Sequence, residues 1–107
     1  MSDANDAVDY IYKNAPLFAK AKSDRVYLEE FRKTKKSLLM LASPETSAVM
    51  READAYAHKE YQELLDGLRV AVEQEEALKW KLTAAQARIE IYRTESANNR
   101  SIDRATQ

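Results

Sequence analysis

The sequence predicts an all-α fold: a long antiparallel helical hairpin of the coiled-coil type with a short N-terminal helix, forming a single domain over residues 1–107. Three observations indicate this fold. The 107 residues include one Gly, two Pro and no Cys, which is too few turn residues for a many-stranded sheet and excludes a disulfide framework. Ala, Leu, Glu, Lys, Gln and Arg are abundant, as in long helices. Apolar residues also recur at alternating steps of three and four, the spacing of paired helices.

The first proline separates two predicted helices. Pro16 closely follows Asn14, and Asn is a favourable residue at a helix N-terminus. We therefore expect a short helix near residues 4–14 and a second helix near residues 16–42.

The second proline marks the predicted start of a third helix near residues 44–98. Ser43-Pro44-Glu45 combines an N-cap residue, a proline at the first helical position and an acid in the first turn. Residues 99–107 are expected to form a tail. At 1.5 Å per residue the third helix would be roughly 80 Å long, and a helix of that length needs a partner helix.

The third helix contains the row of residues that such a partner would contact, which we call the seam. Only Glu75 and Ser96 interrupt its apolar character. Because the junction at Ser43 is short, the second helix is expected to pack antiparallel against the seam. The seam residues are Ala57, Tyr61, Leu64, Leu68, Ala71, Glu75, Leu78, Leu82, Ala85, Ile89, Tyr92 and Ser96. The matching row predicted on the second helix is Leu17, Ala21, Asp24, Leu28, Phe31, Lys35, Leu38 and Ala42.

The charges alternate in blocks that favour the same pairing. Net charge is −2 over residues 1–19, +4 over 20–36, −6 over 45–76 and +3 over 79–107. Folding back near Ser43 places the basic 20–36 block on the acidic 45–76 block, and complementary flanking charges select register in coiled coils. The same fold can bring a second set of opposite charges together, namely Asp3, Asp6 and Asp9 with Lys79 and Lys81.

A second apolar row, which we call the stripe, lies about 140° around the third helix from the seam. A small helical protein has few segments of its own to cover a helix that is apolar on two sides. The stripe is therefore expected to mediate homo-oligomerisation, with cover by the N-terminal helix as the alternative. The seam does not choose between two, three or four helices. The stripe residues are Ala77, Trp80, Ala84, Ala87 and Ile91.

The sequence lacks the signatures of an enzyme. His58 is the single histidine, and Asp54 one turn before it is too small a ligand set for a metal site. The run from Glu73 to Glu76 has no pocket to shift its pKa values. Gly-rich phosphate loops and nucleophile motifs are also missing. We expect a non-enzymatic protein with no cofactor, no metal and no small-molecule substrate.

Membrane and secretory signals are likewise missing. No apolar run is long enough to span a bilayer, and the acidic start is not a signal peptide. The lack of cysteine suits a reducing cytoplasm. We therefore expect a cytoplasmic protein without a membrane partner.

The basic C-terminal end is the candidate binding surface. Its cations can complement the dipole of their own helix, or they can bind phosphates or an acidic partner. Trp80 nearby can serve as an interface residue or stack on a nucleic-acid base. The candidate binding residues are Lys81, Arg88, Arg93, Asn98, Asn99, Arg100 and Arg104.

Several helical stretches together resemble a group of short bacteriophage and prophage proteins. The likeness covers most of residues 10–104 and has no catalytic signature. It implies a phage-encoded accessory protein made in the cytoplasm of an infected bacterium, from a gene of the kind often found near recombination and replication functions. The stretches are Ala19-Lys-Ala-Lys, Arg25-Val-Tyr-Leu-Glu-Glu-Phe-Arg-Lys, Leu38-Leu-Met, Arg51-Glu-Ala-Asp-Ala-Tyr-Ala, Tyr61, Ile89-Glu-Ile-Tyr-Arg and Ala97-Asn-Asn-Arg.

The expected function is accordingly that of a phage accessory factor in DNA recombination or replication. It would bind single-stranded nucleic acid or a DNA-handling protein such as a phage recombination protein. The alternative is a coiled-coil assembly or adaptor protein, related to the virion or directed at a host protein, that does not contact nucleic acid.

Overall fold

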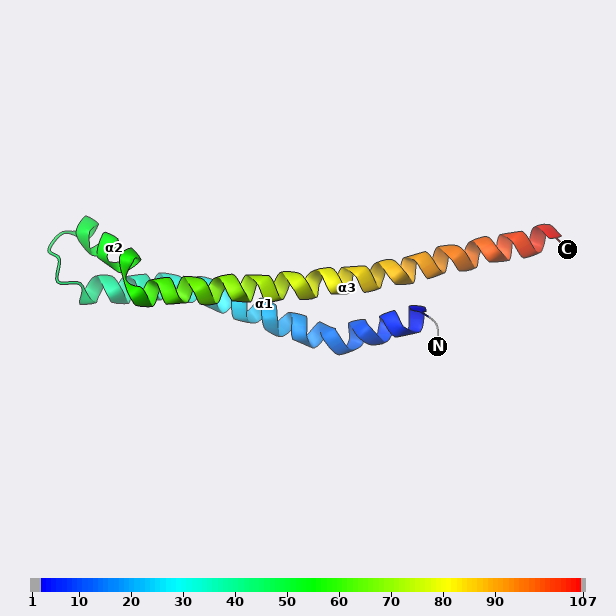
Figure 1. The fold of residues 1–107 in the computed structure, drawn as a ribbon, viewed down its shortest axis with the longest axis horizontal. Coiled ribbons are helices and arrows are strands. Elements are labelled where there is room, and N and C mark those ends of the chain that lie inside the picture. Colours follow the sequence, from blue (N-terminus) through cyan, green and yellow to red (C-terminus); the bar gives the residue numbers. More distant parts are fainter. Residues whose placement is uncertain (1–2, 107) are drawn as a thin grey trace. The chain divides into compact units, whose positions relative to one another are not determined.

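The computed structural model describes residues 3–106, which form three α-helices: α1 (Asp3–Ala42), α2 (Ala48–Ala57) and α3 (Lys59–Thr106) (Figure 1). Helix α3 packs against α1, so the chain is the all-α helical hairpin that the sequence predicts. Its contacts divide it into two compact units. Lys20–Glu75 form one, which we call the turn unit, and the described parts of Met1–Ala19 and Glu76–Gln107 form the other, the terminal unit.

The predicted break at Pro16 is wrong, because α1 is continuous through it. A proline inside a helix removes one backbone hydrogen bond and costs about 3 kcal/mol. Pro16 is exposed, as are both of its neighbours, so the ring lies on the solvent side of α1. The packed residues Asn14 and Phe18 lie on either side of it and continue one row. Packing of that row offsets the cost of the proline.

The predicted helix start at Ser43 and Pro44 is also wrong. The Ser43 hydroxyl accepts a hydrogen bond from the Glu45 amide at 3.2 Å, which stabilises a turn in the loop. Helix α2 begins at Ala48, after Ser47, whose hydroxyl accepts a hydrogen bond from the Met50 amide at 3.1 Å. A contact three residues ahead is the N-cap geometry. Ser47 therefore caps the helix.

The predicted helix 44–98 is in fact two helices, because His58 separates α2 from α3 with an extended backbone. Side chains satisfy the polar groups at the break. The His58 Nδ1 atom accepts a hydrogen bond from the Glu60 amide at 3.0 Å. The Gln62 side-chain amide donates to the Tyr56 carbonyl at 2.8 Å. Such caps allow a helix to end without Gly or Pro.

The predicted tail is helical over its described part, since α3 continues to Thr106, and Gln107 lies outside the described residues. Asn98 and Asn99 do not end the helix. An asparagine inside a helix costs at most about 0.7 kcal/mol relative to alanine, and no Gly or Pro follows to stop propagation.

The predicted seam of α3 is confirmed. From Tyr61 to Ser96 every seam residue is buried or half-buried except Tyr92, and Leu65 is the only other residue of that segment that is not exposed. Ala57, the first predicted seam residue, is exposed at the end of α2.

The predicted row on α1 is partly wrong. Ala21, Leu28, Phe31 and Lys35 are at least half-buried, whereas Leu17, Asp24, Leu38 and Ala42 are exposed. Apolar residues occur in adjacent pairs at 17–18 and 38–39, so the sequence allows two rows one residue apart. The packed row is Ala4, Ala7, Ile11, Asn14, Phe18, Ala21, Arg25, Leu28, Arg32, Lys35 and Leu39.

Candidate functional site

The first polar site lies in the turn unit, where Arg25 on α1 binds Glu75 on α3. The Arg25 Nε atom donates to Glu75 Oε2 at 2.6 Å and its Nη2 atom to Oε1 at 3.0 Å. Its Nη1 atom donates to Glu29 at 3.0 Å. The two carboxylates raise the pKa of Arg25 above its usual value. With side-chain exposures of 24% and 11%, Arg25 and Glu75 form a polar layer within the seam.

Two lysines of α1 make further ion pairs in the turn unit. Lys35 lies 3.0 Å from Glu60 on α3, and this contact lowers the pKa of the Glu60 carboxyl. Lys36 lies 3.4 Å from Glu52 on α2 and 4.7 Å from the centre of the Tyr56 ring. Tyr56 and then Glu52 raise the pKa of Lys36. Three cations of the basic 20–36 block are therefore paired with acids of α2 and α3, in the direction that the charge blocks predict, whereas Lys20 and Lys33 pair within α1.

Most of the predicted basic residues of the terminal unit lack an acidic partner in the described part of the chain. Among residues 3–106, Lys81, Arg88, Arg100 and Arg104 have no acidic group within 4.0 Å. Arg93 alone of the predicted set has one, Glu90 on the preceding turn at 3.3 Å. The sequence predicts that the N-terminal acids Asp3, Asp6 and Asp9 approach Lys79 and Lys81. Among the described residues these acids form no ion pair with either lysine. The C-terminal end of α3 thus presents cations whose charge is not neutralised.

Three of the predicted binding residues share one shallow groove on α3. The residues that line this groove recur at spacings of three, four and seven, which places them on one side of a helix. Tyr92, 46% exposed, lies among them and continues the seam. Every described residue after Ser96 is exposed, so α1 does not cover this end of the seam. We call this the basic groove; it is lined by Ile89, Tyr92, Arg93, Ser96, Asn99 and Arg100.

The other predicted residues lie outside the basic groove. Lys81 and Arg88 line a separate hollow together with Tyr10 of α1. A separation of seven residues places them along the flank of the seam opposite to Arg93 and Arg100. Asn98 and Arg104 are exposed and line neither hollow. The seven predicted residues are therefore not one site.

The stripe is uncovered in the described chain. Trp80 and Ile91 are 62% and 58% exposed, and the three alanines of the stripe are exposed as well. Ala7 is buried and Ile11 is half-buried, and both belong to the packed row of α1. The N-terminal part of α1 therefore does not cover the stripe. Trp80 Nε1 donates a hydrogen bond to Glu76 at 3.2 Å, at the edge of the stripe.

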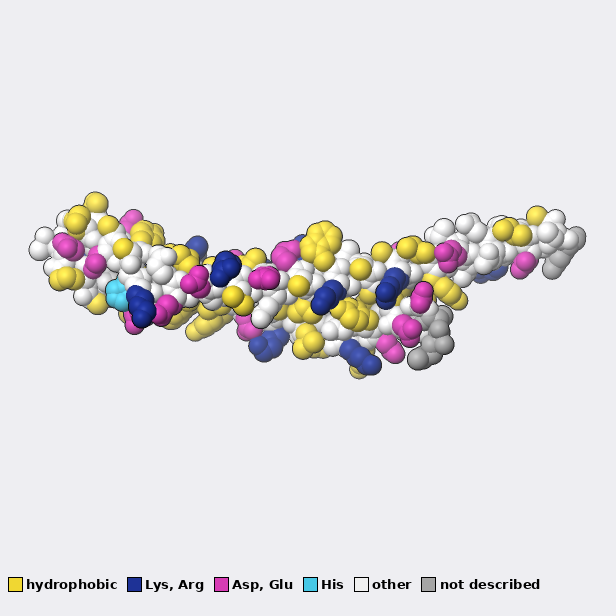
Figure 2. Space-filling model, viewed as in Figure 1, with side chains coloured by type: hydrophobic (Ala, Val, Ile, Leu, Met, Phe, Trp, Pro, Cys, Tyr) yellow, Lys and Arg dark blue, Asp and Glu magenta, His cyan; other side chains and the backbone are white. Residues whose placement is uncertain are grey.

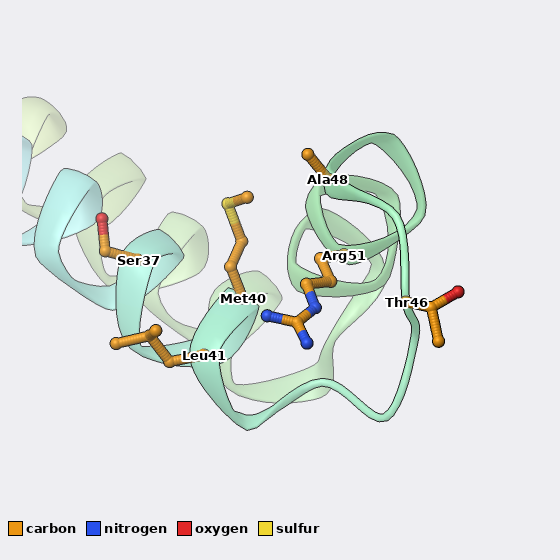
Figure 3. Close-up of a pocket in the computed structure, with 6 residues that line it drawn as sticks. All are labelled: Ser37, Met40, Leu41, Thr46, Ala48 and Arg51. Carbon is orange, nitrogen blue, oxygen red and sulfur yellow. The ribbon is translucent and has the colours of Figure 1, made fainter.

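A pocket that the sequence does not predict lies between the end of α1 and the start of α2 (Figure 3). In that view the Arg51 guanidinium points toward the end of α1 at Met40, the Met40 side chain extends beside it, and Thr46 points away. Arg51 Nε donates to the Glu45 carbonyl at 2.7 Å. Figure 2 shows hydrophobic side chains gathered over α2 and its surroundings. The loop conformation creates this pocket, which a helical pattern does not predict; its lining is Ser37, Met40, Leu41, Thr46, Ala48 and Arg51.

Residues 3–106 contain no group of three or more His, Cys, Asp or Glu side chains placed to hold a metal ion. Of the helices in the same residues, none has the length and apolar character needed to cross a bilayer.

Comparison with known proteins does not assign a function, so the functional proposal rests on the surfaces described above. No protein-family model matches the chain, and neither the curated proteins nor the solved structures contain a significant match to it.

Proposed function

We propose that the protein is a non-catalytic accessory factor of DNA recombination or replication that binds single-stranded nucleic acid through the C-terminal end of α3. One observation carries the proposal. The cations of α1 are largely matched with acids, whereas Arg100, Arg104, Arg88 and Lys81 on α3 have no acidic group within 4.0 Å among the described residues. Unmatched cations supply the sequence-independent part of phosphate binding.

The basic groove supports single strands as the ligand. Tyr92 is exposed and lines the groove together with Arg93, Asn99 and Arg100. An aromatic ring can stack on an unpaired base while neighbouring guanidinium groups contact its phosphates. A duplex offers its bases only within its grooves, so it would use the cations but not the ring.

The number of cations sets the strength of binding. Three or four phosphate contacts per chain, at about −0.7 each, give a log–log salt slope of roughly −2 to −3 for a single strand. Binding should therefore be weak and strongly dependent on salt.

Fluorescence anisotropy with a labelled single-stranded oligonucleotide at low salt tests the proposal. The double variant R100A/R104A should lose most of the binding, because it removes two of the four cations that have no acidic group within 4.0 Å among the described residues. The matched control is K20A/K33A, which also removes two positive charges, from exposed lysines already paired with Asp24 and Glu30. Equal loss in both variants, or no binding by the parent at tens of micromolar protein, would contradict the proposal.

We further propose that the protein acts in the cytoplasm of an infected bacterium, as its resemblance to phage and prophage proteins implies. The second candidate is a coiled-coil assembly or adaptor protein, related to the virion or directed at a host protein. The observation that favours it is the uncovered stripe with Trp80 and Ile91, because large exposed apolar side chains in a row indicate a protein contact. A parent protein that fails to bind nucleic acid would favour this second candidate.

A further inference from the structure

We propose that the stripe binds a second copy of this chain, with the two α3 helices parallel and related by a two-fold axis. The stripe has the spacing of a coiled-coil interface, since its residues follow alternating steps of three and four. Its alanines permit close approach of two helices, and Trp80 supplies a large apolar group to the contact. The inference does not depend on nucleic-acid binding.

The charges that flank the stripe indicate which partner it accepts. One flank contains Glu76 and Glu90, separated by Thr83. The opposite flank contains Lys81 and Arg88. A surface with one acidic and one basic flank is complementary to itself, as a two-fold interface between identical chains requires.

The same flanks select the parallel orientation. In a parallel pair, a residue on one flank faces the residue five positions later on the opposite flank of the partner helix. Glu76 then faces Lys81, and two-fold symmetry forms this ion pair twice. In an antiparallel pair centred on Ala84, the acidic flank would face the acidic flank of the partner helix and the basic flank would face its basic flank. That arrangement brings like charges together on both sides.

Local contacts prepare these groups for the parallel pair. The hydrogen bond from Trp80 Nε1 holds the Glu76 carboxylate beside the stripe, 3.2 Å from the indole nitrogen. Lys81 has no acidic group within 4.0 Å among residues 3–106, so its charge is available. The parallel pair also places Glu90 opposite Glu95, and Arg93 offsets this repulsion because it binds Glu90 within its own helix at 3.3 Å.

Parallel pairing has a structural consequence for the basic groove. Both copies of the groove lie at the same end of the paired α3 helices. A single strand long enough to reach both would make twice as many phosphate contacts, and the second contact would be intramolecular.

Sedimentation equilibrium tests whether the stripe mediates the association. The parent should be a dimer at micromolar concentration. Ala84→Glu places a charge at the centre of the stripe and should raise the dissociation constant at least about tenfold. Ala53→Glu, at an exposed position of α2, should leave it unchanged. Ala84 is exposed within the single chain, so circular dichroism should show equal helicity for both variants. A parent that stays monomeric at high micromolar concentration would overturn the inference.

Cysteine cross-linking tests the orientation, because the chain has no native cysteine. Ala77→Cys should form a disulfide between two copies under mild oxidation, since residue 77 faces its counterpart only in the parallel pair. In the antiparallel pair it would face residue 91. A mixture of the Ala77→Cys and Ile91→Cys proteins that yields chiefly the mixed disulfide would contradict the parallel arrangement.

Discussion

Small residues let the helices of each unit approach closely. In the terminal unit the most buried side chains are Ala7 and Ala85, and in the turn unit Ala55 and Ala71 are likewise buried. The distance between two packed helices depends on the side chains at the contact. Buried alanines therefore mark contacts at which the helices can approach closely.

Gly67 offers a direct test of the helix at a single residue. It lies within α3 on the exposed side, and a Cβ atom added there would meet no atom within 4 Å. Gly67→Ala should raise the free energy of unfolding by about 1 kcal/mol, since alanine is favoured in helices and restricts the unfolded chain. Urea denaturation followed by circular dichroism measures the change. An unchanged or lower midpoint would argue against a continuous helix at this position.

The helical elements differ in how far the sequence predicts them. The seam of α3 is readable because its members are mostly Leu, Ala, Ile and Tyr at regular spacing. The row on α1 is ambiguous, because Leu17 and Phe18 are adjacent and only the partner helix selects Phe18. The break at His58 escapes prediction because an imidazole, which is not a usual N-cap residue, provides the cap. Pro16 leads to a wrong prediction because it lies on the exposed side of a well-packed helix, where packing of the other side offsets the free-energy cost of the proline.

The pairing of α1 with α3 should depend on their polar layer. Glu75→Gln removes the negative charge that faces Arg25 within the seam, whereas Glu73→Gln makes the same chemical change at an exposed position. Glu75→Gln leaves Glu29 as the counterion of the half-buried Arg25 and weakens its pairing with α3, so it should lower the urea midpoint more than Glu73→Gln. Equal shifts for the two variants would mean that the layer contributes nothing to the pairing.

Over the whole molecule the charges have two distinct roles. In the turn unit Arg25, Lys35 and Lys36 of α1 pair with acids of α2 and α3, which favours the hairpin. At the C-terminal end of α3 four of the five predicted cations have no acidic group within 4.0 Å among the described residues, leaving them available to a ligand. The sequence predicts both charge blocks, but only the structure separates Lys81 and Arg88 from the basic groove. The pocket at Met40 and Arg51 depends on a loop and was not predictable from helical periodicity.

The most direct measurement of the proposed function is the site of a photochemical cross-link to bound nucleic acid. A single-stranded oligonucleotide that carries a photoreactive thymidine analogue is irradiated with the protein at low salt, and the attached peptides are identified by mass spectrometry. The cross-links should lie within residues 89–100, with Tyr92 as the principal site, because that ring is exposed among the cations of the basic groove. Cross-links confined to residues 20–36, or none above the level seen in high salt, would contradict the proposal.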